Sequence, residues 1–286
     1  MLIEYIIATF LCFINDLILE DFVWENYERV LRQQAIMFTV FIAAIGTLFG
    51  SFLNVVITRL PEKGKFLSES RSYCLSCGTT LKWYDLLPVV NWFILLGKCR
   101  TCKAHISLRY PLVELMGALL AASAIWWFDF SLFSVIVYAV TMILLAIAVI
   151  DFRTTEIPDS LHIALIPFAI ASLWLMPDVT ILSHIIGIVT IALPMLLLSM
   201  AVPGAFGGGD IKLMFVCGLL LGWQLTLLAF FIALLLGGSY AIYLMISKKR
   251  KRGEHMVFGP ALCAGVALSL YFGSYIIDLY LGLFMY

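Results

Sequence analysis

The chain contains a series of long apolar stretches that carry few or no charged residues. A transmembrane helix needs about 20 consecutive apolar residues to cross the roughly 30 Å hydrocarbon core of a bilayer. With 63% hydrophobic and 13% charged residues, the sequence has too few polar side chains to cover a soluble domain. We therefore predict an all-α, polytopic membrane protein with about eight transmembrane helices. The stretches are 33–58, 110–128, 130–150, 160–177, a tract beginning at 179, two segments within 213–247, and 256–277.

The basic residues are unevenly distributed along the chain. Nine of the 18 Lys and Arg lie between Arg59 and Arg109, and five more form the run KKRKR at 248–252. Loops rich in Lys and Arg stay in the cytoplasm, whereas the loops on the other side contain Asp129 and Asp178 but no basic residue. One orientation satisfies this rule through all eight spans. The predicted cytoplasmic segments are 59–110, 151–160, 203–212 and 247–256.

The first 35 residues form a separate N-terminal extension. Residues 2–19 are apolar but are interrupted by Glu4 and Asp16, and they lack the basic start of a signal peptide. Residues 21–34 are charged and amphipathic. We favour an additional helix at the membrane interface over a ninth span, because a ninth span would place basic residues on the non-cytoplasmic side.

Two aspartates interrupt the apolar pattern at the predicted cytoplasmic ends of spans. Asp151 follows the apolar run 141–150, and Asp210 follows the sequence FGGG. An ionised carboxylate at membrane depth is costly and normally marks an ion pathway or a catalytic site. Two such carboxylates held close together would share a proton, which is the arrangement an intramembrane aspartyl protease requires. The alternative is a transporter whose embedded acids carry protons or cations.

The segment after Asp210 is short for a membrane span. About a dozen residues separate it from a predicted turn at 222–224, which corresponds to roughly 18 Å of helix against a hydrocarbon core of about 30 Å. We therefore expect Asp210 to lie below the cytoplasmic surface, beside a water-filled cavity or within protein. Gly207 and Gly209 lack a Cβ and would let a substrate backbone approach. The alternative is a Gly-rich turn in which Asp210 is the N-cap of the next helix.

Four cysteines form two CxxC pairs, Cys74 with Cys77 and Cys99 with Cys102. Two such pairs about twenty residues apart have the spacing of a zinc ribbon, in which four thiolates complete a tetrahedral site. The predicted cytoplasmic location keeps thiols reduced and so favours a metal over disulfides. Four cysteines leave no open coordination position, so we predict a structural Zn²⁺ that folds a loop without a core of its own. Residues 59–110 are called the four-cysteine loop below.

Several motifs, in order along the chain, resemble those of the type IV prepilin peptidases, which are GxGD-type intramembrane aspartyl proteases. The resemblance covers residues 45–265 and leaves out residues 1–35. The GxGD motif corresponds to Gly207-x-Gly209-Asp210, and the first aspartate motif to Asp151 followed by Ile157-Pro158-Asp159. The other matching segments are GSFLNVV at 50–56, RLP at 59–61, the four cysteines, ISLRYPLVEL at 106–115 and FGP at 258–260.

This resemblance implies a bifunctional enzyme of the bacterial inner membrane. Such enzymes remove the basic leader from type IV prepilins or type II secretion pseudopilins on the cytoplasmic side, cutting after a glycine. They then N-methylate the new N-terminus with S-adenosylmethionine. For cleavage we expect one of Asp151 and Asp210 to act as base on water and the other as acid. No Gly-rich nucleotide fingerprint is present, so the residues that bind S-adenosylmethionine stay unassigned.

The resemblance also implies how the chain is divided into parts and which molecules it contacts. We expect contact with prepilin substrates and with membrane lipids, partly through the basic run 248–252, and no nucleic-acid partner. The predicted parts are the extension 1–35, a first transmembrane helix at 36–58, the four-cysteine loop 59–110 and a seven-helix membrane peptidase core at 111–286.

Four further polar residues lie within or beside the spans. Glu114 could pair with Arg109, bind a cationic substrate, assist methyl transfer or form a hydrogen bond near the membrane surface. Asn54 is expected to form an interhelical hydrogen bond. Lys212 is expected either to shift the pKa of the preceding aspartate or to extend to the membrane surface. Asp159, which follows Ile-Pro, is expected to be an N-cap or a residue at the membrane surface rather than a catalytic acid.

Overall fold

The computed structural model describes residues 33–34, 36–62, 71–74, 76–176, 179–247 and 257–284. Within these residues the chain is predominantly helical, with two isolated β-bridges and no β-strand. This agrees with the predicted all-α fold. The N-terminal extension, apart from Gln33 and Gln34, and the basic run 248–252 lie outside the described residues.

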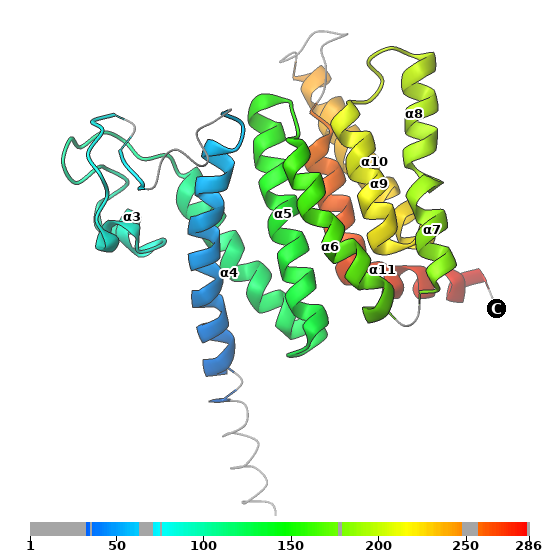
Figure 1. Ribbon diagram of the computed structural model, residues 1–286, viewed down its shortest axis with the longest axis horizontal. Coiled ribbons are helices and arrows are strands. Elements are labelled where there is room, and N and C mark those ends of the chain that lie inside the picture. The colour runs from blue at the N-terminus through cyan, green and yellow to red at the C-terminus, as the bar shows by residue number, and fades with distance from the viewer. Residues whose placement is uncertain are drawn as a thin grey trace, which may run out of the picture.

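Each of the eight predicted apolar segments contains a helix, and six of the described helices are long and apolar enough to cross a membrane (Figure 1). The other two predicted spans are the shorter helices α6 (Asp159–Leu175), with 17 residues, and α9 (Gly208–Leu221), with 14 residues. The six long helices are Ile36–Arg59, α4 (Arg109–Phe128), α5 (Leu132–Thr154), α7 (Ile181–Thr190) continued by α8 (Ala192–Ala201), α10 (Trp223–Ile246) and α11 (Gly259–Phe284).

Helix α9 lies in the middle of the helical body, where it contacts α6, α7, α8, α10 and α11. Its side chains Leu213 and Met214 are fully buried. It approaches α7 at Gly187 and Gly218, where a Cβ on either residue would meet the backbone of the other helix. Small residues permit this close contact between membrane helices. The helix ends before Gly222, whose φ of 77° starts the turn into α10, as the sequence predicted.

The helix Ile36–Arg59 packs against α4 in the same manner. Gly46 lies against Gly117, and neither position has room for a Cβ. The side-chain amide of Asn54 donates to the carbonyl oxygen of Tyr110 at 3.0 Å, which confirms the predicted interhelical hydrogen bond. This contact joins the first span to the start of α4, next to the four-cysteine loop.

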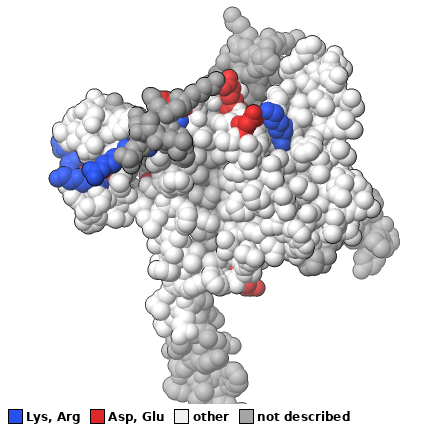
Figure 2. Space-filling view, viewed as in Figure 1, with Lys and Arg blue, Asp and Glu red and all other residues white. Residues whose placement is uncertain are grey.

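The four-cysteine loop projects from one side of the helical body, beside the helix Ile36–Arg59 (Figure 1). Its described part contains a short 3₁₀-helix, Trp83–Leu86, and the helix α3 (Val90–Ile94). Figure 2 shows Lys and Arg side chains gathered on this loop, whereas most of the visible surface of the helical body carries no charged side chain. A body of this composition suits a lipid environment.

Candidate active site and cysteine cluster

The two aspartates lie at the same end of the helical body. Asp151 is in the last turn of α5 and Asp210 in the first turn of α9, and their exposed fractions are 6% and 8%. Figure 1 shows that the end of α5 and the starts of α9 and α11 lie together. The backbone N–H of Gly259, at the start of α11, donates to Oδ2 of Asp151 at 3.1 Å. The N–H of Gly207 donates to Oδ2 of Asp210 at 3.3 Å.

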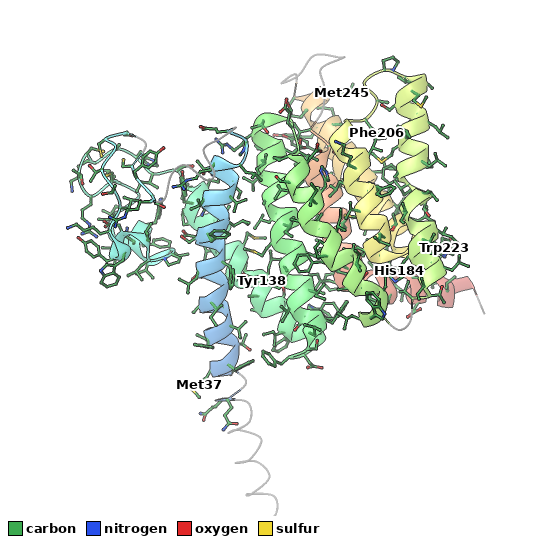
Figure 3. The ribbon with its side chains drawn as sticks, in the orientation of Figure 1. Met37, Tyr138, His184, Phe206, Trp223 and Met245 are labelled. Carbon is green, nitrogen blue, oxygen red and sulfur yellow. The ribbon has the colours of Figure 1, made fainter. Side chains whose placement is uncertain are left out.

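An aromatic contact joins the two glycine segments. Phe206 precedes Gly207 and Phe258 precedes Gly259, and the centroids of the two phenylalanine rings are 5.9 Å apart. The ring of Phe230, from α10, lies 6.4 Å from each of them. Figure 3 places Phe206 at this end of the body, with His184 at the opposite end. The aspartates are close enough for the charge of one to act on the other.

The glycines of the GxGD motif have distinct roles. Gly207, not Asp210, is the N-cap of α9, so the alternative that made Asp210 the N-cap is wrong. A Cβ on Gly209 would lie 3.0 Å from Cβ of Ile157, because the segment between α5 and α6 packs against this glycine. The first aspartate motif and the GxGD motif therefore contact each other directly.

His162 is a site residue that the sequence reasoning missed. It lies on α6, is 5% exposed, and its Nε2 is 3.0 Å from the carbonyl oxygen of Gly209. Its Nδ1 lies 3.7 Å from Oδ1 of Asp159. The i, i+3 spacing of Asp159 and His162 on one helix was the available signal. This histidine ties α6 to the Gly-rich segment that carries Asp210.

Lys212 and Asp159 pair with each other. Nζ of Lys212 lies 2.7 Å from Oδ1 of Asp159, and both side chains are largely exposed. The two expectations for Lys212, a pKa effect on Asp210 or an extended position at the membrane surface, both missed this ion pair. Asp159 is the first residue of α6 rather than its N-cap, which is Pro158. Its exposed position agrees with a surface residue.

Glu114 lies outside the aspartate site. Its exposed fraction is 8%, and its Oε2 accepts the backbone N–H of Val89 at 2.7 Å. It forms no ion pair with Arg109, whose Nη2 instead donates to the hydroxyl of Thr58 at 3.3 Å. Glu114 therefore joins α4 to the four-cysteine loop.

The four cysteines come together in two similar turns. The N–H of Gly78 donates to the carbonyl oxygen of Cys74 at 2.8 Å, and the N–H of Lys103 donates to that of Cys99 at 3.0 Å. The residue after each CxxC pair has a positive φ, 69° at Gly78 and 58° at Lys103. The isolated bridges Tyr73–Thr80 and Lys98–His105 close the two turns.

This cluster fits a tetrahedral metal ion. Among the described residues, the Sγ atoms of Cys74, Cys77, Cys99 and Cys102 lie within 4.8 Å of one another. The Sγ atoms of Cys74 and Cys102 are 3.8 Å apart, and a tetrahedral site with Zn–S bonds of about 2.3 Å requires S···S distances of about 3.8 Å.

Comparisons with known proteins give one consistent result. The model of the bacterial peptidase A24 N-terminal domain matches residues 44–128, and that of the type IV leader peptidase family matches residues 138–242. Relatives named prepilin leader peptidase/N-methyltransferase include one from Bacillus subtilis, 31% identical over 82% of this chain and 95% of its own length. Another, from Burkholderia pseudomallei, is 31% identical over 82% of this chain and 85% of its length. No solved structure matches the chain. The chain belongs to the type IV leader peptidase family.

Proposed function

We propose that this protein cleaves the basic leader from prepilins or pseudopilins with Asp151 and Asp210 as its catalytic pair, and then N-methylates the new N-terminus. The observation that supports the cleavage half is the placement of two buried carboxylates at one end of the helical body, each accepting a hydrogen bond from a backbone N–H. The names of the relatives support both activities. They give no support to the transporter alternative.

The chemistry follows from a carboxylate pair that shares one proton. Two negative charges held close in a site of low dielectric constant resist joint ionisation, so the pair holds one proton near neutral pH. The ionised carboxylate takes a proton from water, whose oxygen attacks the peptide carbonyl carbon. The protonated carboxyl first donates toward the carbonyl oxygen, and a proton then passes to the departing amine as the C–N bond breaks.

The Gly-rich segment before Asp210, together with the residues that pack against it, would keep the Asp210 carboxylate in position for catalysis. Gly207 binds the Asp210 carboxylate, and His162 and Ile157 hold Gly209 from the side of α6. Backbone N–H groups at the start of α9 favour negative charge at this point. We therefore assign positioning roles to Gly207, Gly209 and His162.

We further propose that the cysteine cluster holds Zn²⁺ and that the methyl donor is S-adenosylmethionine. Zn²⁺ fits the four-sulfur donor set and would fix the two turns of a loop that has little apolar core. The enrichment of basic residues in this loop supports an orientation in the inner membrane with the aspartates facing the cytoplasm.

Co-expression with a leader-bearing prepilin tests the cleavage half. We expect the wild-type chain to shorten the prepilin, and Asp151→Asn or Asp210→Asn to lower the rate at least about a thousandfold, because each removes an acid–base group. Asp278→Asn is a matched control, since Asp278 is an exposed aspartate further along α11. Mass spectrometry of the pilin measures the outcome. Normal cleavage by either Asn variant of the pair would refute the assignment.

A further inference from the structure

A cavity of about 760 Å³ lies outside the aspartate pair. Its volume is within the roughly 300–1,000 Å³ of typical small-molecule sites. The cavity lies between the four-cysteine loop, the helix Ile36–Arg59 and the start of α4. Arg153, two residues after Asp151, also lines it. The two aspartates do not line this cavity, so cleavage leaves its polar groups unused.

Two buried polar atoms of the cavity lining lack a hydrogen-bond partner within the described part of the chain. Oδ1 of Asn54 and Nε of Arg109 have no hydrogen-bond partner there, although both residues line the cavity. Asn54 is 3% exposed. Buried polar atoms in folded proteins are normally hydrogen-bonded. A free acceptor and a free donor on facing helices would both be satisfied by a ligand that carries donor and acceptor groups.

The chemistry of the lining residues matches that of one methyl donor. A carboxylate on the ligand suits Arg109 and Arg153, which are near enough for their charges to interact. N–H groups on the ligand suit Oδ1 of Asn54. A sulfonium cation suits the carboxylate of Glu114, and the aromatic residues Tyr84, Trp92 and Tyr110 offer ring faces for a cation or a purine. S-adenosylmethionine carries each of these groups.

We propose that this cavity is the S-adenosylmethionine site and that Asn54, Arg109 and Glu114 are its polar anchors. The proposal rests on the N-methyltransferase half of the proposed function. More basic than acidic side chains line the cavity, among them Arg59, Arg109 and Arg153. This charge balance disfavours the basic leader itself as the occupant, because like charges repel.

The position of the cavity suits a reaction that follows cleavage. Asp151 and Arg153 share the last turn of α5, so the cavity lies at the same end of the helical body at which cleavage creates the new α-amine. The two side chains point to different faces of the helix, so the cleaved pilin must move its new α-amine to the cavity. The uncharged amine attacks the methyl carbon with its lone pair. The C–S bond breaks with its electron pair going to sulfur, which leaves S-adenosylhomocysteine. The methylated ammonium then loses a proton, and Glu114 is the buried carboxylate of the described lining that can accept it.

Direct binding tests the proposal without relying on activity. The probe is S-adenosylmethionine, titrated calorimetrically into the purified protein in detergent without pilin, so that no methyl acceptor is present. We expect Asn54→Ala and Glu114→Gln each to raise Kd about tenfold or more, because each removes a hydrogen bond or a charge contact in a desolvated site. Glu156→Gln is the matched control, since Glu156 is an exposed acid near the same end of α5 and does not line the cavity. Prepilin cleavage serves as the measure of correct folding for every variant.

A second measurement locates the ligand in the unaltered protein. Ultraviolet irradiation with S-adenosylmethionine labelled in its methyl group should mark peptides from residues 51–59 or 84–114. Equal Kd values for wild type and both cavity variants, or label confined to α9 and α11, would overturn the location even if methyl transfer is observed. Absence of both binding and transfer in the wild type, with cleavage intact, would instead refute the methyltransferase half of the proposed function.

Discussion

Asp151 is held by the backbone N–H of Gly259, 108 positions later in the chain, whereas each cysteine turn is closed by hydrogen bonds that span four or five residues. The aspartate site is therefore a product of long-range helix packing. The cysteine cluster is a product of local turns, and a metal bound there would supply the cohesion that a core would give. A substitution that shifts the backbone of the packed helices should therefore move the aspartates directly. The effect of a substitution in the four-cysteine loop should instead depend on whether it changes metal binding.

The largest effect outside the catalytic pair is expected at Gly259. A Cβ at this position would lie 2.5 Å from Oδ2 of Asp151, so Gly259→Ala must displace the carboxylate or the start of α11. Displacement of a catalytic group by about 1 Å can cost about a hundredfold in rate, and we expect a loss of that order in prepilin cleavage. Gly238→Ala, where a Cβ meets no atom within 4 Å, should cleave at the wild-type rate. Unchanged cleavage by Gly259→Ala would mean that this contact does not position Asp151.

The cysteine cluster should respond differently. We expect Cys99→Ser to lower the zinc content and to open the loop to limited proteolysis. Methyl transfer should fall more than cleavage, because the loop lines the large cavity and does not supply the aspartates. Lys98→Ala, at an exposed neighbouring residue outside the cavity lining, is the control. Elemental analysis and paired activity assays measure the outcome. Full zinc content in Cys99→Ser would contradict a four-cysteine site.

The two regions also differ in how well the sequence predicted them. The apolar runs predicted all eight helical segments, and the CxxC spacing predicted the cluster, because both signals are local. The partners of the helices were harder to predict. A helix that is apolar on all sides has no polar face to show its orientation, so nothing in the sequence paired Gly259 with Asp151 or Lys212 with Asp159. Asn54 is an exception, because a lone amide in an apolar helix needs a partner.

His162 shows how such a missed contact can be tested. Its hydrogen bond to the carbonyl oxygen of Gly209 joins residues 47 positions apart. We expect His162→Leu to lower the cleavage rate about fivefold, because one buried hydrogen bond contributes about 1 kcal/mol. His162→Gln keeps a side-chain N–H donor and should restore part of the rate. If the Leu and Gln variants cleave equally well, the N–H donor has no positioning role.

The smallest effects should come from the exposed ion pairs, which also differ between the regions. Lys212 and Asp159 have side-chain exposures of 58% and 67%, so Lys212→Met should leave stability nearly unchanged and change cleavage by less than about twofold. In the loop, Arg100 pairs at 2.8 Å with Asp85, whose side chain is only 10% exposed. Arg100→Met leaves this more buried carboxylate unpaired and should destabilise the protein more than Lys212→Met does. Thermal unfolding of both variants at low and high salt shows which variant loses more stability. Salt screens the exposed pair more strongly, so the effect of Lys212→Met should depend more on salt concentration. A larger loss of stability in Lys212→Met would mean that the aspartate-bearing end of the helical body depends on this surface contact more than its exposure implies.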